Sequence, residues 1–569
     1  MRTPRELYHT TPIVYSCELD VCLKCGEPLK VAYVSAVKTV QTLTGVLGIA
    51  HRPKCCLEPS CAQHKTIYKS AQWQQIAPLY CTYGYDVIAH IGWQRQTGCQ
   101  SFQALHEDLQ ARLQISEAEV RHLYQERYLP LLACHERQRL AELTVVAERA
   151  GLILSLDGLA PEGGEPQLWV VRELQTGLTL RSGWLSQQDQ GTFERFLQPI
   201  HDLGLLVAAI ISDKQRGLVP AVAAVFPQAK HSFCQMHYLK NAAEPVAALD
   251  QEMKIALRQS VRAEIGPLIR QEQVETEGVL TVTGLVPSPV EAETKCQPEE
   301  PVPQNADALI NQEREAIVQD LKRRIRYLLT LKGRPPFRLA GIEMFERLTE
   351  VKTCLTTLIT HYPEPQLVLL YQGLHAALQS VQTEYTDLRQ AADWLQVIAH
   401  ILDPDDKPPR TGIEVRQELF TYLDTIPKER QLPPDLEYLY QAILKTTRNY
   451  APGLFHCYDL PGLPRTNNDR ESEFRDLNRR LLQTSGQKGL ARRTIQRQGA
   501  WELIPRPDSL RATVLALSQV NTDDFRQERH RVRAHRHRFQ LHTRSAKQSG
   551  RQLEQLTNRW LALPAQDST

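Results

Sequence analysis

The sequence lacks a membrane-length apolar run and a secretory leader. Hydrophobic residues make up 42% of the 569 positions, yet no stretch approaches the roughly 18 consecutive apolar residues that a membrane helix needs. The N-terminal sequence MRTPRELYHTTPIVY has no apolar signal-peptide core. We therefore expect a soluble, cytoplasmic protein with no membrane partner.

The chain also lacks an excess of either charge and any internal repeat of 20 to 50 residues. The 67 Lys and Arg are balanced by 65 Asp and Glu, although opposite charges can still be segregated along a sequence. The absence of a repeat excludes a solenoid. At roughly 100 to 200 residues per domain, this length predicts about three to five globular units.

Cysteine is scattered outside one N-terminal cluster, a pattern that favours metal binding in a reducing compartment over a disulfide framework. The cluster reads C-x-x-C, then a β-prone stretch, then Cys-Cys-Leu-Glu-Pro-Ser-Cys-Ala-Gln-His. This two-plus-two arrangement is typical of a structural Zn²⁺ site, and we expect a zinc-binding module over residues 1–75. The preferred ligands are Cys22, Cys25, Cys56 and Cys61, with Cys55 and His64 as substitutes. Reduced cysteines without metal are the alternative.

Residues 76–140 have a helical pattern. Three amphipathic segments are joined by short polar links, and Ser116 with Glu119 forms a capping box at the start of the third. Such helices suit a helix-turn-helix DNA-binding domain. The third helix would offer Glu119, Arg121, His122 and Gln125 to DNA.

Residues 150–245 have an α/β pattern in which two aspartates follow buried strands. Asp157 ends the apolar run from Gly151, and Asp213 ends the run from Leu205. Carboxyl ends of neighbouring strands meet at one edge of an α/β sheet, so the two carboxylates can converge on divalent cations, which prefer oxygen ligands. Each aspartate alone could instead mark a turn or a helix cap.

Residues 246–459 are expected to form a helical insertion, with an acidic, proline-rich loop near 271–308. A helix then begins near Arg465, so that residues 460–485 return to the α/β core. Residues 486–569 are rich in Arg and Lys and are expected to be a basic C-terminal DNA-binding tail.

The order of these features carries a resemblance. After Asp213 come Cys234-Gln-Met-His237 and, far downstream, Arg465-Thr-Asn-Asn-Asp-Arg-Glu471. The set resembles DDE transposases of the Mutator and hAT type and their bacterial insertion-sequence relatives. The resemblance implies a multidomain α/β fold whose RNase H-like mixed-sheet core is interrupted by the helical insertion.

The same resemblance implies a function. Asp157, Asp213 and Glu471 would be the catalytic residues and would hold two Mg²⁺ (or Mn²⁺) ions, which together favour phosphoryl transfer on DNA. The expected reaction is cleavage at the ends of a mobile element followed by strand transfer. The implied partners are double-stranded DNA, as element ends and target, and a second copy in a homodimer, associated with the nucleoid of a prokaryotic cell.

Two parts of the site rest mainly on the resemblance. Glu471 could simply complete a capping box with Asn468, and Glu473 is a rival ligand on another face of the helix. Cys234 and His237 are only half of a zinc site, and the resemblance gives them a supporting role.

The arginines expected to bind DNA flank the last predicted helix of the core and fill the C-terminal region. They are Arg492, Arg493, Arg497, Arg529, Arg531, Arg533, Arg536 and Arg538. A solvated helix face is the alternative interpretation. For the whole chain, the alternatives are a domesticated, non-catalytic DNA-binding protein and an RNase H-like nuclease.

Overall fold

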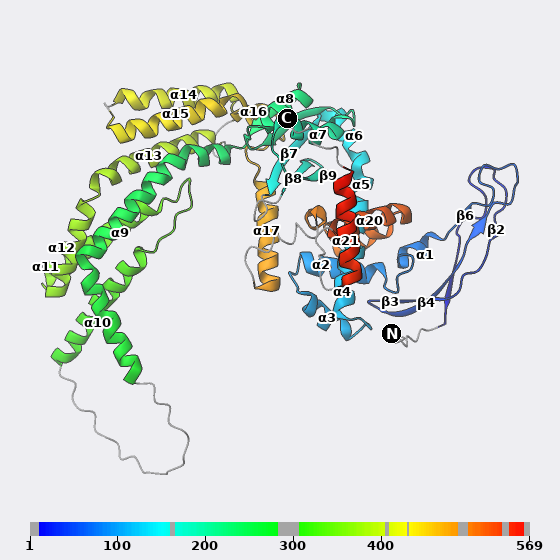
Figure 1. Cartoon of the computed structure of the whole chain (residues 1–569), viewed down its shortest axis with the longest axis horizontal. Helices are drawn as coiled ribbons and strands as arrows, with labels where there is room; N and C mark the ends of the chain where they lie inside the picture. The colour runs from blue at the N-terminus through cyan, green and yellow to red at the C-terminus, as the bar shows by residue number, and fades with distance from the viewer. Residues whose placement is uncertain are drawn as a thin grey trace, which may run out of the picture. The chain divides into compact units, whose positions relative to one another are not determined.

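The computed structural model describes residues 11–159, 166–282, 306–403, 409–429, 432–486, 499–537 and 545–562 (Figure 1). Within these ranges, the side chains of 270–282, 306–308, 428–429, 468–474, 478 and 485 are not described. The chain forms two compact units, one comprising Met1–His231 with Asn467–Thr569 and the other Ser232–Thr466. The first unit is therefore discontinuous in sequence, as the predicted insertion requires.

Short strands dominate the N-terminal module. Strands β1 (Ile13–Ser16), β4 (Gly45–Arg52) and β3 (Lys38–Thr42) form one sheet in that order, and β2 (Lys30–Val31), β5 (Lys54–Cys55) and β6 (Ile67–Tyr68) form a second. Helix α1 (Ala71–Ile76) follows. Strands of two residues bury too little apolar surface to stabilise a sheet by themselves, so the second sheet needs another source of stability.

A helical domain comes next. Its elements are α2 (Tyr85–Gln96), α3 (Phe102–Gln110), α4 (Glu117–Leu123), the π-helical turn η1 (Tyr124–Tyr128) and α5 (Leu129–Gln138). The predicted N-cap is confirmed, since the Ser116 hydroxyl accepts the Glu119 N–H at 3.3 Å. Gly92 lets α2 approach η1, because a Cβ there would lie 2.1 Å from the Tyr128 ring.

The C-terminal region is packed into this helical domain. Helices α19 (Leu510–Ser518) and α20 (Thr522–His537) bring Leu517, Val520 and Phe525 into the same core as α2 and α5. The prediction of a tail over 486–569 is therefore wrong for these helices. The region contains many charged residues, and the prediction overlooked the apolar residues that recur among them every three to five positions and form one face of each helix. Helix α21 (Ala546–Leu561) has no buried residue.

A five-stranded mixed sheet forms the α/β part. Its strands are β7 (Leu152–Leu159), β8 (Gln167–Glu173), β9 (Thr179–Leu185), β10 (Val207–Ser212) and β11 (Lys230–Phe233), in the order β11-β10-β7-β8-β9. Strands β7, β8 and β9 are antiparallel neighbours, whereas β10 runs parallel to β7. Helix α6 (Glu142–Ala150) leads into the sheet. The mixed sheet predicted from the sequence is present.

Both faces of the sheet are covered. On β8, Trp169 and Val171 pack in a core with α7 (Gln190–His201) and α8 (Leu218–Val225), while Leu168 and Val170 pack against α17 (Asn468–Ser485). This alternation follows from the two-residue period of a strand. Helix α17 thus packs on the sheet, although 234 residues (467 − 234 + 1) lie between it and β11 in the sequence.

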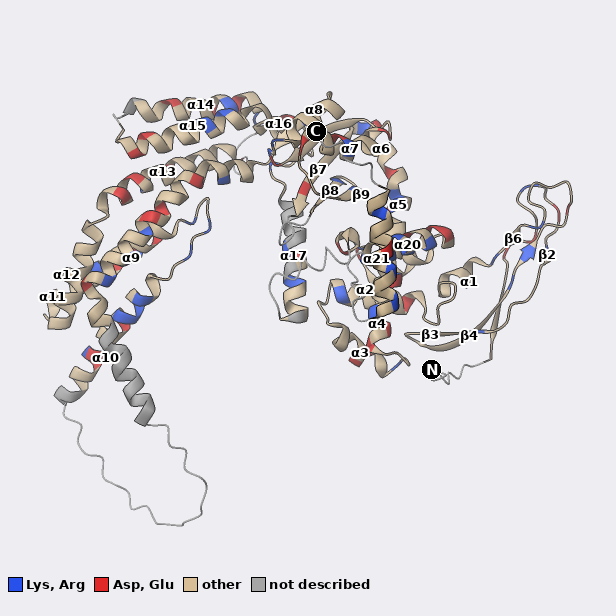
Figure 2. Cartoon of the chain, viewed as in Figure 1, with Lys and Arg blue, Asp and Glu red and all other residues tan. Residues whose placement is uncertain are grey.

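The second unit is helical, as predicted for the insertion. Its helices are α9 (Gln235–Val282), α10 (Ala306–Leu328), α11 (Ala340–His361), α12 (Pro365–Gln379), α13 (Gln382–Leu402), α14 (Gly412–Glu429), α15 (Pro434–Leu454) and α16 (His456–Asp459). Acidic and basic residues are interspersed along most of them (Figure 2), although α12 has neither. Helix α9 continues to Val282, so the expected acidic loop begins later than residue 271; residues 283–305 lie outside the described part.

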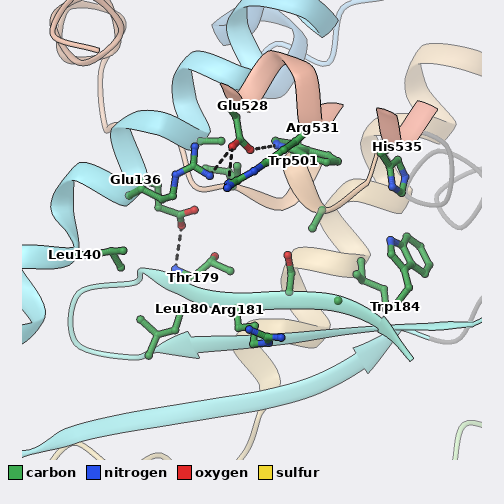
Figure 3. A pocket seen from close by; sticks show the side chains of 17 residues that line it. Glu136, Leu140, Thr179, Leu180, Arg181, Trp184, Trp501, Glu528, Arg531 and His535 are labelled. Carbon is green, nitrogen blue, oxygen red and sulfur yellow. Dashed lines mark hydrogen bonds and ion pairs between the residues drawn. The ribbon is translucent and has the colours of Figure 1, made fainter. Parts of the chain in front are cut away.

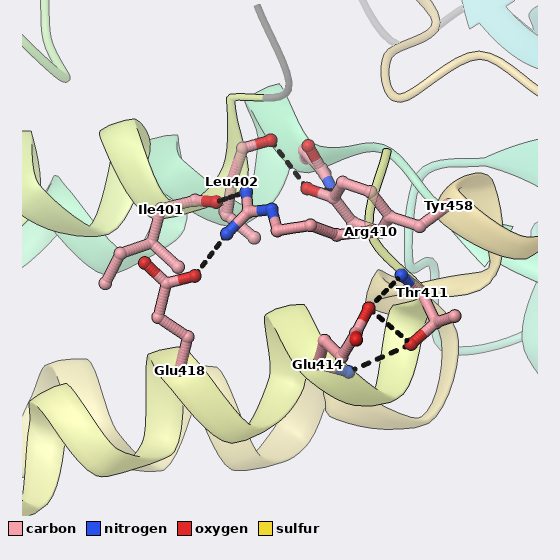
Figure 4. A network of polar contacts seen from close by, with 8 residues as sticks. Ile401, Leu402, Arg410, Thr411, Glu414, Glu418 and Tyr458 are labelled. Carbon is pink, nitrogen blue, oxygen red and sulfur yellow. Dashed lines mark hydrogen bonds and ion pairs between the residues drawn. The ribbon is translucent and has the colours of Figure 1, made fainter. Parts of the chain in front are cut away.

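Polar contacts connect the C-terminal end of α13 to the helices that follow it. The Arg410 guanidinium donates to the Ile401 carbonyl at 2.7 Å and pairs with Glu418 (Figure 4). The Tyr458 hydroxyl donates to the Leu402 carbonyl at 2.5 Å. These contacts hold the end of α13 against α14 and α16. Among the described helices, none combines the length and apolarity needed to cross a membrane.

Candidate active site

Asp157 and Asp213 lie on adjacent parallel strands. The register pairs Ile210 with Leu154 and Ile211 with Ser155. Continued by two residues, it places Asp213, directly after β10, beside Asp157 on β7. Residues paired in this way point to the same face of a sheet, and both aspartates are half-buried. The structure therefore brings two predicted site residues to the same level of neighbouring strands.

Asp157 lies within its strand. The sequence predicted that the strand ends before Asp157, but β7 continues to Leu159 and pairs Asp157 with Val170 of β8. The Asp157 carboxylate accepts the Gly158 N–H at 2.8 Å. A Cβ on Gly158 would lie 2.8 Å from the Trp169 ring. The Asp-Gly pair therefore serves close packing on β8, and the interpretation of these two residues as a turn is wrong.

Asn467 fastens the start of α17 to β7. The Ser155 hydroxyl donates to Asn467 Oδ1 at 2.5 Å, and Asn467 Nδ2 donates to the Leu156 carbonyl at 2.9 Å. Ser155 and Asn467 are both buried. The anchor precedes Asp157 by one residue on β7, so the first turn of α17 begins beside the two aspartates.

Glu471 is the fourth residue of α17. Its side chain, like that of the rival Glu473, lies outside the described residues. The helix begins at Asn468 and its N-cap is Asn467, whose side chain makes no capping hydrogen bond. The alternative of a capping box with Asn468 as its cap is therefore wrong, because Asn468 is already helical. Beyond its place in the Thr-Asn-Asn motif, no sequence pattern indicated the role of Asn467.

Cys234 and His237 belong to the second unit. Cys234 is buried directly before α9, and His237 lies in the first turn of that helix. Their supporting role stays a prediction.

The N-terminal module brings together the four preferred cysteines. The sulfurs of Cys22, Cys25, Cys56 and Cys61 all lie within 4.8 Å of one another. Cys22 and Cys61 Sγ are 3.8 Å apart, and Cys25 and Cys56 Sγ are 3.6 Å apart. A tetrahedral Zn²⁺ with bonds of about 2.3 Å separates its sulfur ligands by about 3.8 Å. The donor set and its spacing therefore fit zinc.

The two substitute ligands lie outside this group. Cys55 is buried on β5, and His64 Nδ1 lies 3.1 Å from the Glu58 carbonyl. The Tyr68 hydroxyl lies 3.5 Å from Cys22 Sγ, and this hydrogen bond lowers the pKa of Cys22. The pKa of Cys25 is raised in spite of its backbone hydrogen bond with Glu27, because desolvation and the neighbouring thiols favour the protonated form. At Cys22 the lowered pKa favours the thiolate, which is the form that binds metal.

Glu126 forms ion pairs with three of the arginines predicted to bind DNA. On η1, its carboxylate meets Arg529 at 3.3 Å, Arg533 at 2.6 Å and Arg536 at 2.9 Å, all on α20. These three side chains therefore share an acidic partner within the fold, while the Arg533 side chain stays 54% exposed. Their role in DNA binding stays a prediction. Glu126 is 403 residues from Arg529 in sequence, too far for a pattern to reveal the contact.

Arg531 pairs with Glu528, three residues earlier on α20. Glu528, whose side chain is 4% exposed, accepts from Arg531 at 3.3 Å and from Trp501 Nε1 at 2.6 Å, and it also pairs with Arg137 (Figure 3). Together these groups line a cavity of about 380 Å³ between α5, β9 and α20. Arg492, Arg493, Arg497 and Arg538 lie outside the described residues.

The candidate DNA-reading residues lie on α4 and η1. Arg121 is exposed, pairs with Glu117 at 3.0 Å and lies over the Phe102 ring. His122 is half-buried, and burial lowers its pKa. The Gln125 carbonyl accepts from Arg536 at 3.0 Å. The backbone N–H of Glu119 donates the N-cap hydrogen bond to the Ser116 hydroxyl.

A buried polar group that the sequence did not reveal joins α17 to the helical domain. The Tyr124 hydroxyl on η1 donates to Glu502 Oε2 at 2.8 Å, and Arg480 of α17 lies 3.4 Å from the same oxygen. Glu502 belongs to η3 (Ala500–Leu503). Burial holds the pKa of Tyr124 well above its ordinary value, so the hydroxyl is a donor near neutral pH.

Comparison with known proteins gives one family match. Residues 179–265 match the family model described as "Transposase, Mutator family", a segment that contains Asp213, Cys234 and His237 but neither Asp157 nor Glu471. No curated protein matches the chain. Among solved structures, the "Drosophila P element transposase strand transfer complex" is similar at a TM-score of 0.30 and 10% identity, covering 79% of this chain and 94% of that one. Over residues 179–265, this chain is similar to Mutator-family transposases.

Proposed function

We propose that the chain is a DNA transposase with an RNase H-like core and a DDE active site at Asp157, Asp213 and Glu471. The observation that carries this proposal is the anchor from Asn467 to β7, which starts the helix of Glu471 beside the carboxylates of Asp157 and Asp213 on neighbouring strands. The Mutator-family match over residues 179–265 supports it.

The three carboxylates would hold two Mg²⁺ or Mn²⁺ ions, which would supply a nucleophile and neutralise charge at the phosphate. The role of the polypeptide itself would be to position the three carboxylates. Strand pairing fixes the spacing of Asp157 and Asp213, and Asn467 fixes where α17 begins. Such placement is most of what a phosphoryl-transfer enzyme contributes.

The remaining parts of the unit fit DNA binding. We propose that the four-cysteine module is stabilised by Zn²⁺, that α2 to α5 act as a helix-turn-helix on double-stranded DNA, and that two copies pair two element ends. The arginines of α20 that face Glu126 carry three positive charges against one negative charge (3 − 1 = +2), which leaves an excess for phosphates.

A cleavage assay tests the proposal. The full chain is incubated with a duplex that carries the DNA flanking its open reading frame, with Mg²⁺ or with EDTA. We expect Mg²⁺-dependent nicking that is lost in Asp213→Asn while duplex binding is retained. Asp202→Asn is the matched control, because Asp202 lies exposed at the end of α7 and away from the strand ends.

Three results would contradict parts of the proposal. Cleavage retained in Asp213→Asn would exclude the assigned site. Duplex binding by the wild type without cleavage would indicate a non-catalytic DNA-binding protein. Cleavage with no preference for the flanking sequence would indicate an RNase H-like nuclease.

A further inference from the structure

Four residues of the π-helical turn η1 contact other segments of the chain through their side chains. Tyr124 reaches Glu502, Glu126 reaches α20, and the Arg127 guanidinium donates to the Tyr80 carbonyl at 3.3 Å. The Tyr128 hydroxyl donates to Gln96 Oε1 at 2.8 Å. π-Helical turns are rare and occur often at functional sites. This one directly follows α4, the helix that offers residues to DNA.

Glu502 lies between this turn and the helix of Glu471. One carboxylate oxygen, Oε2, is within reach of both the Tyr124 hydroxyl and the Arg480 guanidinium. The Glu502 side chain is 5% exposed and that of Arg480 is 12% exposed. Hydrogen bonds to a buried carboxylate are stronger than those at the surface, and their loss leaves a charge without a partner.

The short helix η3 that carries Glu502 is held on its other side as well. Its Trp501 donates to Glu528 at 2.6 Å (Figure 3). The Leu503 carbonyl accepts from Arg172 of β8 at 3.2 Å. Because η3 is held in this way, Glu502 cannot move by itself. A shift of Tyr124 either breaks its bond to Glu502 or moves η3 and, with it, the carboxylate that Arg480 contacts.

Positions 471 and 480 of α17 are nine apart, and over nine positions a regular α-helix turns by about 900°, or half a turn beyond two full turns, and rises by about 13.5 Å. Asn467 fixes the beginning of the helix and Arg480 fixes its opposite face further along. Because a helix is stiff over this length, its rotation at Arg480 sets the direction in which position 471 points.

We propose that Glu502 is a positioning residue that couples DNA contact on α4 and η1 to the rotational setting of α17, and thereby to Glu471. The inference rests on the proposed function, since it assigns DNA contact to α4 and metal binding to Glu471. The coupling through Glu502 would let DNA that binds at α4 and η1 set the orientation of α17, the helix that carries Glu471.

The test compares two tyrosines of the same turn in the full chain. Tyr124→Phe removes the bond to Glu502, and Tyr128→Phe removes a buried hydroxyl bond that does not involve Glu502. We expect similar losses of stability in urea. Only Tyr124→Phe should slow single-turnover cleavage at saturating duplex, by about tenfold to a hundredfold, the range of a hydrogen bond to a charged group. Glu502→Gln should be at least as slow, and the double variant no slower than Glu502→Gln alone.

A second measurement needs no cleavage. Amide hydrogen exchange over residues 475–484 is followed without divalent metal, with and without the duplex that carries the flanking sequence. We expect the duplex to slow exchange in the wild type and in Tyr128→Phe but not in Tyr124→Phe.

The outcomes separate the two proposals. A wild type that binds duplex and shows the exchange response but does not cleave contradicts the proposed function and leaves the coupling standing. Equal effects of the two tyrosine variants, multiplied effects in the double variant, or an exchange response that survives Tyr124→Phe would overturn the coupling.

Discussion

Asn467 shows how a single buried side chain can connect two distant parts of the chain. Replacing it by Ala leaves the Ser155 hydroxyl and the Leu156 carbonyl without this partner. We expect Asn467→Ala to lower the free energy of unfolding by about 1–3 kcal/mol and to slow cleavage, as measured by urea denaturation and the nicking assay. Asn558→Ala, at an exposed position of α21, should change stability by less than about 0.5 kcal/mol. Equal effects of the two changes would contradict the anchor.

Glu126 is the second residue with consequences beyond its own helix. Burial raises the pKa of its carboxyl, but the hydrogen bond from Arg533 and the charges of three arginines outweigh burial, so the pKa is lowered. We expect Glu126→Gln to reduce stability by about 1–3 kcal/mol. Glu117→Gln, which breaks an exposed pair with Arg121, should cost about 0.5 kcal/mol or less.

The pH dependence of this difference follows from the sign of the shift. A lowered folded-state pKa contributes stability above the ordinary carboxyl pKa of about 4.3, and that contribution is lost as pH falls through the folded-state value. The stability gap between the wild type and Glu126→Gln should therefore be constant near neutral pH and narrow on acidification. A gap that widens below about pH 4 would contradict the role of the ionised carboxylate.

At the scale of elements, we expect the N-terminal module to depend on its four clustered cysteines. Its second sheet has strands of two residues, and zinc can supply much of the folding free energy of so small a module. We expect one Zn²⁺ per chain by elemental analysis, lost in Cys56→Ser and retained in Cys55→Ser. The neighbouring Cys55 is buried outside the tetrad, so it is a matched control. Equal zinc content in the two variants would refute the assigned ligands.

Elements with a strong local pattern were predictable from the sequence. The apolar runs gave β7 and β10, and Ser116 gave the start of α4. The cysteine spacing selected the tetrad that the fold brings together. Local pattern is sufficient there because each element's own residues determine its period and its ends.

Contacts between distant segments were not predictable. The arginines of α20 were expected to face DNA, and nothing in their own sequence indicates Glu126 as a partner. The C-terminal helices were expected to be a tail because their charges outnumber the few apolar residues that pack on α2 and α5. Asn467 and Glu502 act through residues more than 300 positions away. Tertiary partners of this kind appear only when the chain is folded.

For the whole molecule, the two-unit division predicts how fragments behave. Residues 232–466 form a continuous helical unit, and this fragment should fold by itself, with a helical circular dichroism spectrum and cooperative thermal unfolding. Residues 1–231 lack α17, α19 and α20, which complete the cores of the first unit. That fragment should unfold without cooperativity unless residues 467–569 are co-expressed with it. Cooperative unfolding of residues 1–231 alone would contradict the division.

Because the first unit is discontinuous in sequence, its core can be completed only late in translation. When residue 231 leaves the ribosome, the sheet still lacks the helix that covers Leu168 and Val170. The intervening residues 232–466 number 235 (466 − 232 + 1), and at about 5–20 residues per second their translation takes about 12–47 seconds. Throughout that interval the nascent chain carries a half-finished core with apolar surface open to chaperones. A message truncated before α17 would leave that surface permanently uncovered.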